Sequence, residues 1–283
     1  MKIYFVTYGN DKFKYSVKRI VKEAHKIEIF DEVISFSEKD LPLYIKSSPL
    51  FSTSKGGGYW LWKPFVVKKI LDQAQMGDAI IYSDAGNKLF KTEQWENYIN
   101  FLKIQDCVFF QYRENFDYGW SKFDTTFNDS PKLKYWCKKR TIQHFENLFS
   151  CDEQWIEKTK ICGGFFLLKK TENSINLINE WLNTMLYFPV IVVDVFENEK
   201  KEQVDGFSYH RHDQSILSII VRLYESKSKV MVLNEEFETK IENQVVRTLR
   251  IIDKKEVSVI RMSLYRMYKY LYKKVEKIII FKL

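Results

Sequence analysis

The sequence has 283 residues, of which 45% are hydrophobic and 16% aromatic, and its net charge is +8 at pH 7. This length and apolar content exclude a largely disordered chain and fit one α/β domain with an appendage, or two small domains. The positive charge favours anionic partners, whether nucleic acid, phosphorylated small molecules or an acidic lipid surface, and does not choose among them.

Cysteine usage and the N-terminal segment indicate an intracellular protein. The four cysteines lie apart, without the Cys-x-x-Cys spacing of zinc or redox sites. Reduced thiols in a cytoplasm are therefore expected. The opening stretch MKIYFVTYGN is too short and too polar for a secretory signal peptide, and no stretch has the roughly 18 apolar residues of a membrane span. We expect a cytoplasmic protein.

The first predicted elements are a strand, a helix and a second strand. Residues 2–7 (KIYFVT) are β-branched and aromatic, residues 12–25 repeat apolar side chains at helical spacing, and residues 32–37 form another strand-like run. This order predicts a parallel sheet, whose ligands bind at the carboxyl ends of the strands. Thr7 and Tyr8, where the first strand ends, are therefore candidate ligand-binding residues.

The stretch GGGYWLWKP, residues 56–64, places three glycines directly before a cluster of aromatic residues. Glycines let backbone amides approach an anion closely, where a Cβ would obstruct it. The rings either close the core under a loop, which we expect for at least one tryptophan, or offer a flat surface to a base or sugar. A lysine before the helix predicted over residues 65–75 would place a positive charge near phosphate. The candidate ligand-binding residues here are Gly57, Gly58, Tyr59, Trp62 and Lys63.

The run DAIIYSDAG predicts a short buried strand over residues 78–82 that ends at Ser83 and Asp84. A carboxylate at the end of a buried strand needs a cation or strong hydrogen-bond donors beside it. Taken alone, such an aspartate is more often a turn residue. Asp84 is the first candidate for a functional charge.

Strands and helices continue to alternate through the middle of the chain. In the stretch ICGG, Gly163 and Gly164 either allow close approach of a ligand or form a strand bulge. The predicted strands cover residues 106–112 and 161–168, and the predicted helices cover residues 141–149 and 174–186.

The segment YHRHDQSILSIIVRLY, residues 209–224, joins a dense polar group to an apolar helix. Asp213 lies near the start of that helix, where capping alone explains a carboxylate. His210 and His212, together with the distant Asp84, are donors that suit Mn²⁺ or Mg²⁺ on a diphosphate. Each signal is weak alone, and their joint occurrence favours a metal and diphosphate site.

Four stretches, in this order, resemble a group of bacterial glycosyltransferases with a GT-A-like fold that act on surface polysaccharides and lipooligosaccharides. They are GGGYWLWKP, IIYSDAG, CGGFFLLKKTENSINLINEWL and HRHDQSILSII, and the resemblance runs from about Lys2 to Tyr224. It implies an α/β, Rossmann-like mixed sheet flanked by helices. It also implies a nucleotide-diphosphate sugar as donor, a saccharide or glycolipid as acceptor, no nucleic acid as partner, and Mn²⁺ or Mg²⁺ as cofactor.

The resemblance also implies roles for single residues. The family's acidic motif is often written DxD, and the matching stretch YSDAG has one aspartate, so Asp84 would carry the metal contact, with Ser83 at most a weak helper. A histidine late in the domain would complete the coordination, with His212 preferred slightly over His210. Asp213 would be the base for the acceptor hydroxyl in an inverting enzyme, or a sugar contact in a retaining one. Further candidates are Arg211 and Gln214 for donor binding, and Asp194 and Asp205 near the acceptor.

The end of the chain differs in composition from the rest. Residues 1–250 are predicted as the glycosyltransferase domain and residues 251–283 as a basic helical tail. Residues 261–283 interleave Arg and Lys with Leu, Tyr and Ile. Such a helix either lies on an anionic membrane surface, at the inner face of the plasma membrane, or packs on its own domain.

Two other functional classes fit parts of the sequence. A nucleotidyltransferase would also hold a metal and a nucleotide on an α/β sheet, but a glycine-rich signature with a trailing basic motif is missing near the first strand. A non-catalytic nucleotide or nucleic-acid binder would explain the charge and the aromatic residues. It would leave the strand-end carboxylate and the HRHDQ group unexplained.

Overall fold

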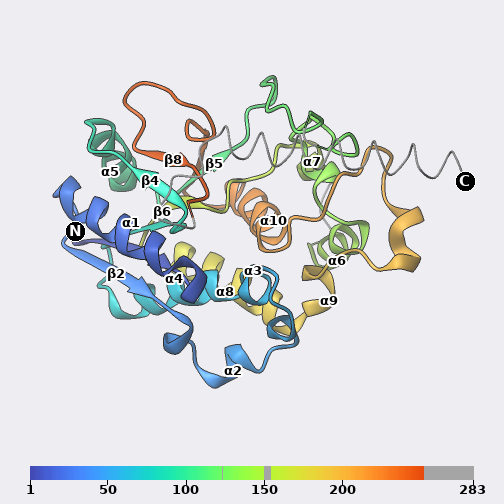
Figure 1. Cartoon of the computed structure of the whole chain (residues 1–283), viewed down its shortest axis with the longest axis horizontal. Coiled ribbons are helices and arrows are strands. Elements are labelled where there is room, and N and C mark those ends of the chain that lie inside the picture. Colours follow the sequence, from blue (N-terminus) through green and yellow to red (C-terminus); the bar gives the residue numbers. More distant parts are fainter. Residues whose placement is uncertain (123, 150–153, 252–283) are drawn as a thin grey trace, which may run out of the picture.

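The computed structural model describes residues 1–122, 124–149 and 154–251. Its centre is a six-stranded sheet in the order β2-β1-β3-β6-β5-β7 (Figure 1). Five strands run in one direction, and β6 runs antiparallel to both of its neighbours, β3 and β5. The strands are β1 (Ile3–Tyr8), β2 (Glu32–Phe36), β3 (Ala79–Ser83), β5 (Cys107–Gln111), β6 (Phe165–Lys169) and β7 (Val230–Asn234).

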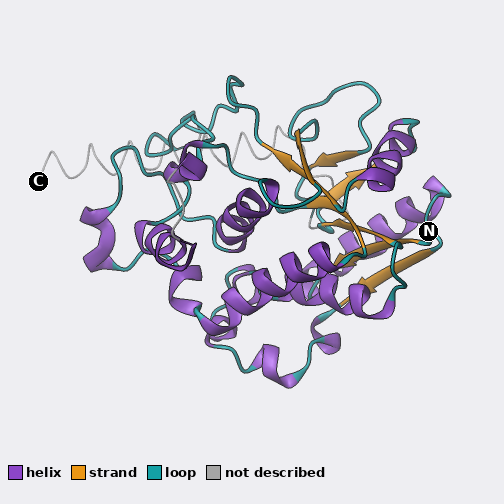
Figure 2. Cartoon of the chain, turned by 180° about the vertical axis from the view of Figure 1, so that it is seen from behind, coloured by secondary structure: helices purple, strands orange, loops and turns teal. Residues whose placement is uncertain are grey.

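Helices cover both faces of this sheet (Figure 2). Ile80 and Tyr82 of β3 pack toward α4, α8 and α10, whereas Ile81 packs toward α1 and α5 on the opposite face. Burial on both sides explains why the central strands are nearly continuous apolar runs. The helices are α1 (Lys14–Ile27), α2 (Leu43–Lys46), α3 (Gly56–Tyr59), α4 (Trp62–Gln73), α5 (Gln94–Ile104), α6 (Lys139–Phe149), α7 (Gln154–Glu157), α8 (Glu172–Tyr187), α9 (Pro189–Val192) and α10 (Asp213–Glu225).

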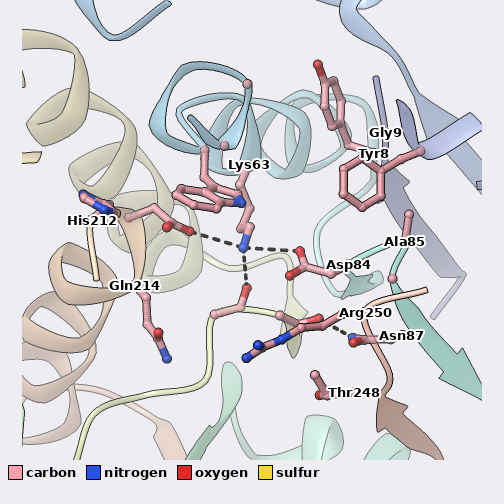
Figure 3. Close-up of a pocket in the computed structure, with 18 of the residues that line it drawn as sticks. Tyr8, Gly9, Lys63, Asp84, Ala85, Asn87, His212, Gln214, Thr248 and Arg250 are labelled. Atoms are coloured by element: carbon pink, nitrogen blue, oxygen red, sulfur yellow. Dashed lines mark hydrogen bonds and ion pairs between the residues drawn. The ribbon is translucent and has the colours of Figure 1, made fainter. Parts of the chain in front are cut away.

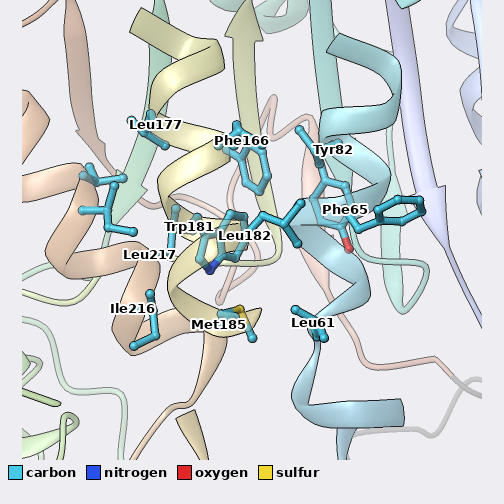
Figure 4. Close-up of a cluster of buried hydrophobic side chains, with 14 of the residues drawn as sticks. Leu61, Phe65, Tyr82, Phe166, Leu177, Trp181, Leu182, Met185, Ile216 and Leu217 are labelled. Atoms are coloured by element: carbon cyan, nitrogen blue, oxygen red, sulfur yellow. The ribbon is translucent and has the colours of Figure 1, made fainter. Parts of the chain in front are cut away.

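Trp181 of α8 joins the core to the start of α10. Its indole is fully buried and meets Phe166 of β6 edge-on, with ring centroids 6.1 Å apart (Figure 4). The indole N–H donates to the backbone carbonyl of Asp213 at 3.1 Å. The hydrophobic core therefore sets the position of Asp213 relative to the sheet.

A second, two-stranded sheet joins segments far apart in the sequence. β4 (Asn87–Leu89) pairs antiparallel with β8 (Val246–Thr248). Beyond β8, the amide of Ile251 donates to the carbonyl of Gly86 at 3.0 Å, and Ile251 is buried. The last described residues therefore lie against the turn that follows β3.

The structure confirms the predicted α/β class with a mixed sheet flanked by helices. One predicted strand is shorter than expected: it begins at Phe165 instead of residue 161, and Ile161 makes an isolated bridge to Gln111. The glycines at 163 and 164 precede the strand and offer no side chain to pack on it. The elements without a counterpart among the predicted ones are α5, β4, β7, β8 and the four-residue helices α2, α3, α7 and α9.

The proposed tail lies outside the described residues from position 252 onward. Its predicted helix over 261–283 and the division near residue 250 both remain predictions. Within the described ranges, no helix combines the length and the apolar character needed to cross a bilayer.

Candidate active site

A pocket with a volume of about 530 Å³ lies at the sheet edge where β1 and β3 end (Figure 3). Because β6 runs the opposite way, the residues before it arrive at the edge where β3 finishes, and the Asp84 amide donates to the Gly164 carbonyl at 2.9 Å. Many of the sequence candidates line this pocket. They are Tyr8, Gly57, Trp62, Lys63, Asp84, Gly163, Gly164, Arg211, His212, Asp213 and Gln214.

Lys63 links the two carboxylates of the pocket. Its Nζ lies 3.3 Å from Oδ1 of Asp84 and 3.2 Å from Oδ2 of Asp213, and it donates to the Gly163 carbonyl at 2.9 Å (Figure 3). The Lys63 and Asp213 side chains are only 4% and 6% exposed, whereas Asp84 is 36% exposed. Asp84 is therefore the carboxylate of this group that is open to a ligand.

The pKa values of this group follow from burial and mutual attraction. Burial lowers the pKa of Lys63, but attraction to Asp213 and Asp84 outweighs it and raises this pKa above its usual value. Burial and repulsion from Asp84 raise the pKa of Asp213, whereas attraction to Lys63 lowers it. The net result is a pKa of about 6. The group thus places the Lys63 side chain between Asp84 and Asp213.

Helix α1 holds the turn that carries Asp84. Arg19 donates through Nη2 to the carbonyls of Ala85 and Asn87, at 2.8 and 2.6 Å. Glu23, four residues later on the same helix, pairs with Arg19 and accepts from the Leu89 amide at 2.9 Å. These contacts satisfy backbone groups of the turn and so fix the direction of the strand-end carboxylate.

The glycine-rich loop is a left-handed turn. Five successive residues have positive φ, between 51° and 92°: Gly56, Gly57, Gly58, Tyr59 and Trp60. This conformation is common for glycine and costs roughly 1–2 kcal/mol for any other residue, so Tyr59 and Trp60 carry strain. Backbone strain of this kind is concentrated at functional sites.

Two backbone amides of this loop donate hydrogen bonds to carbonyls just before it in the chain. Gly57 donates to Ser54 and Gly58 donates to Lys55, each at 3.1 Å, so these two amides do not make the predicted approach to a diphosphate. Trp62 stacks on Tyr8, with ring centroids 4.0 Å apart, and its N–H donates to the Gly56 carbonyl at 2.9 Å. Trp62 is thus a core residue at the pocket floor.

His212 lies at the pocket wall in a strained conformation, with φ of 53° and ψ of −119°. Its Nδ1 lies 2.8 Å from the Val192 carbonyl and its Nε2 3.1 Å from the Tyr209 hydroxyl. The ring also stacks on Trp60. Burial lowers the pKa of His212 to about 4, so the ring is neutral at pH 7.

His210 faces away from the pocket. Its side chain is 1% exposed, its Nδ1 accepts from the Lys138 amide at 3.2 Å, and its Nε2 lies 3.0 Å from the Ile191 carbonyl. Both ring nitrogens therefore bind backbone groups, and His210 anchors the segment before α10 to α9.

The side chains around Asp84 do not fit a divalent metal. Asp84 Oδ1 already accepts from the Tyr82 hydroxyl at 2.6 Å and lies beside the Lys63 ammonium. His212 offers no free ring nitrogen in this arrangement. Across the described ranges, no three His, Cys, Asp or Glu side chains are grouped to hold one ion. The predicted manganese dependence has no ligand set here.

Four other candidates for donor binding lie outside the pocket lining, in addition to His210, and so do the acceptor-side candidates Asp194 and Asp205. Gly58 packs against the ring of Phe51, where a Cβ would stand 2.7 Å away. Tyr59 donates to Asp194 Oδ2 at 2.8 Å, and Ser83 accepts from Asn87 at 3.1 Å. The fourth is Thr7, which is fully buried.

Several lining residues were not predicted from the sequence. Thr248 is the last residue of β8 and Arg250 lies two residues beyond it, so the pairing of β8 with β4 brings both to the pocket. Asn87 belongs to the turn that carries Asp84. Asn87 Nδ2 donates to the Gly164 carbonyl at 2.9 Å. The sequence could have suggested Asn87, because it is a polar residue three positions after Asp84. No sequence pattern could have suggested Arg250, because only the pairing of the two short strands brings it to the pocket.

The comparisons with known proteins give weak matches. No family model matches the chain, and no curated protein matches it. Two glycosyltransferases and a synthase are among the solved structures that are similar in outline. A glycosyltransferase involved in the glycosylation of the major capsid of PBCV-1 has 6% identity and a TM-score of 0.40, over 83% of this chain and 82% of the other. Mouse xyloside xylosyltransferase 1, in its apo form, has 11% identity and a TM-score of 0.41, over 83% and 86%.

The third structure is the 4-diphosphocytidyl-2C-methyl-D-erythritol synthase of Anaerococcus prevotii. It has 10% identity and a TM-score of 0.42, over 93% of this chain and 98% of the other. All three TM-scores lie below 0.5, so these matches carry no argument about activity.

Proposed function

We propose that this protein is a glycosyltransferase that moves a sugar from a nucleotide-diphosphate sugar to a saccharide or glycolipid acceptor. One observation carries the proposal: two carboxylates, Asp84 and Asp213, are paired through the buried Lys63 at the floor of a pocket at the sheet edge. Ligands of α/β proteins bind at this edge, and the volume of about 530 Å³ lies in the range of small-molecule sites.

Cationic side chains supply the charge that a diphosphate needs. Arg211 and Arg250 line the same pocket. Nε of Arg211 is buried without a hydrogen-bond partner, and its guanidinium lies 4.8 Å from the ring centre of Trp136. A planar guanidinium held against an indole presents its remaining N–H groups in one direction, which suits bidentate binding of phosphate oxygens.

Asp213 is the residue we assign to the acceptor side of the reaction. With a pKa of about 6 it is ionised at neutral pH; it lines the pocket, and its Oδ2 faces the Lys63 ammonium at 3.2 Å. An ionised carboxylate with a pKa just below the working pH is suited to accept a proton from an acceptor hydroxyl. In a retaining enzyme the same carboxylate would instead contact a sugar hydroxyl. Lys63 keeps this carboxylate in place in either case.

The proposal is tested with a panel of nucleotide sugars. The full-length protein is expected to release nucleoside diphosphate from at least one of them, and Asp84→Asn and Asp213→Asn are expected to abolish the release while keeping the melting temperature. Asp117→Asn, in an exposed ion pair with Lys122, is the matched control. Salt-sensitive oligonucleotide binding, with no turnover of any nucleotide sugar, would contradict the proposal and favour a nucleic-acid binder.

The proposed setting is the synthesis of a cell-surface glycan, such as lipooligosaccharide, capsule or O-antigen, at the inner face of the plasma membrane. The resemblance of four sequence stretches supports the first part. The basic and apolar composition of residues 261–283 supports the second.

A further inference from the structure

The Lys63 ammonium is surrounded by oxygen atoms. Its neighbours are the Gly163 carbonyl at 2.9 Å, Asp213 Oδ2 at 3.2 Å and Asp84 Oδ1 at 3.3 Å. An ammonium has three hydrogens, and here three oxygens lie within reach of them. Each carboxylate of the pocket floor is therefore already neutralised in part by a cation that belongs to the chain.

The position of this ammonium is fixed by its surroundings. Lys63 follows the left-handed turn, lies in the first turn of α4, and its amide donates to the Trp60 carbonyl at 2.9 Å. Its Nζ lies 5.8 Å from the ring centre of Trp62 and 5.7 Å from that of Tyr82. Only 4% of the Lys63 side chain is exposed, so the ammonium cannot turn away into solvent.

A dication at Asp84 would meet this fixed positive charge. It would have to share Oδ1 with the ammonium and the Tyr82 hydroxyl, or bind Oδ2 alone beside the ammonium. Like charges at such separations repel strongly at a partly buried site. A single carboxylate oxygen is also a poor site for Mn²⁺ or Mg²⁺, which take several oxygen or imidazole ligands.

We propose that Lys63 takes the place of a divalent metal at Asp84, so that a nucleoside diphosphate binds this pocket without metal. In this arrangement Lys63 balances the two carboxylates, and Arg211 and Arg250 contact the phosphates. The identity of the ligand rests on the proposed function. The claim about metal rests only on the surroundings of Asp84.

Manganese titration of the full-length protein tests this claim without any nucleotide. Mn²⁺ bound to protein is followed by electron paramagnetic resonance in the wild type, Asp84→Asn and Lys63→Met. The wild type and Asp84→Asn are expected to bind equally weakly, with a Kd above about 1 mM. Lys63→Met, which leaves two carboxylates without their cation, is expected to bind at least about tenfold more tightly.

A wild-type Kd below about 100 μM that is lost in Asp84→Asn would overturn the inference. This comparison decides the matter even where Lys63→Met does not fold, because Asp84 is partly exposed and its replacement keeps the side-chain shape.

Calorimetry with uridine, guanosine and cytidine diphosphates gives a second readout. At least one is expected to bind with a Kd that changes by less than about twofold between EDTA and excess Mn²⁺. Binding that requires Mn²⁺ would overturn the inference. Absence of binding by every diphosphate in both conditions would contradict the proposed function, while the manganese titration would still decide the role of Lys63.

Discussion

Gly164 lies directly against the carboxylate of Asp84. A Cβ built on Gly164 would stand 2.9 Å from Asp84 Oδ2 and 3.5 Å from its Cγ. The two backbones are also joined, because the Asp84 amide donates to the Gly164 carbonyl. Only a residue without a side chain leaves room for Asp84 in this position, which gives the second glycine of the ICGG stretch a defined role.

Gly164→Ala is therefore expected to displace the Asp84 carboxylate and to lower turnover by about 100-fold, with a small effect on stability. The measurement is kcat with the nucleotide sugar identified by the panel, alongside the melting temperature. Gly163→Ala is the matched control, because its Cβ would meet its nearest neighbours at 3.6 Å or more, an ordinary contact distance. Equal losses in both variants would contradict this role of Gly164.

Activity is expected to depend on the ionisation of Asp213. Its pKa is raised to about 6, and a base acts in its deprotonated form, so kcat/KM is expected to fall as the pH drops below 6 and to level off above it. Lys63→Met removes the attraction that lowers this pKa, so in a folded variant the acid limb is expected to move to higher pH.

The pH profile of kcat/KM measures this shift. Lys68→Met is the matched control, since Lys68 lies on the same helix and pairs only with the exposed Asp72 among its described contacts. An acid limb that stays at the same pH in Lys63→Met would remove Asp213 from the role of base.

The left-handed turn makes two glycine substitutions distinguishable. Gly57 has φ of 59°, and a Cβ there would have no neighbour closer than 3.6 Å, so Gly57→Ala is expected to lower the free energy of unfolding by about 1–2 kcal/mol through backbone strain alone. At Gly56, with φ of 57°, a Cβ would also stand 2.4 Å from the Trp60 ring. Gly56→Ala is therefore expected to lower the free energy of unfolding by clearly more than Gly57→Ala does. Urea unfolding measures both, and equal values would contradict the described packing of Trp60.

The basic C-terminal segment gives a prediction outside the described residues. Deletion of 261–283 is expected to abolish binding to vesicles that contain anionic lipid, because the Lys and Arg side chains supply the attraction to such a surface. Cosedimentation with anionic and neutral vesicles measures this. Unchanged binding by the shortened protein would rule out the surface helix.

Local patterns predict much of this fold because they report local structure. The apolar runs that became β1 and β3, and the helical spacing that became α1 and α8, depend on neighbours within one element. The residues at the ends of those runs were candidates for the same reason. Asp84, Lys63 and Asp213 were each proposed separately.

Their contact could not be predicted, because it depends on pairings between distant segments. Lys63 of α4 meets Asp84 at the end of β3 and Asp213 at the start of α10, and the antiparallel β6 brings Gly163 to the same place. The two histidines of HRHDQ look equivalent in sequence, yet the positive φ of His212 sends the rings to different partners, and only His212 lines the pocket. Periodicity does not report a single unusual backbone angle.

The β4–β8 pairing has a consequence for how the protein is made. Tyr8 belongs to β1, which leaves the ribosome before the other strands of the main sheet, whereas Thr248 and Arg250, on the same pocket, leave it after all six strands of that sheet. A nascent chain can therefore assemble its scaffold first and gain its complete pocket last. The protein then gains its affinity for a ligand late in its synthesis. A chain released before Val246 would keep the main sheet and its helices but would lack one wall of the pocket.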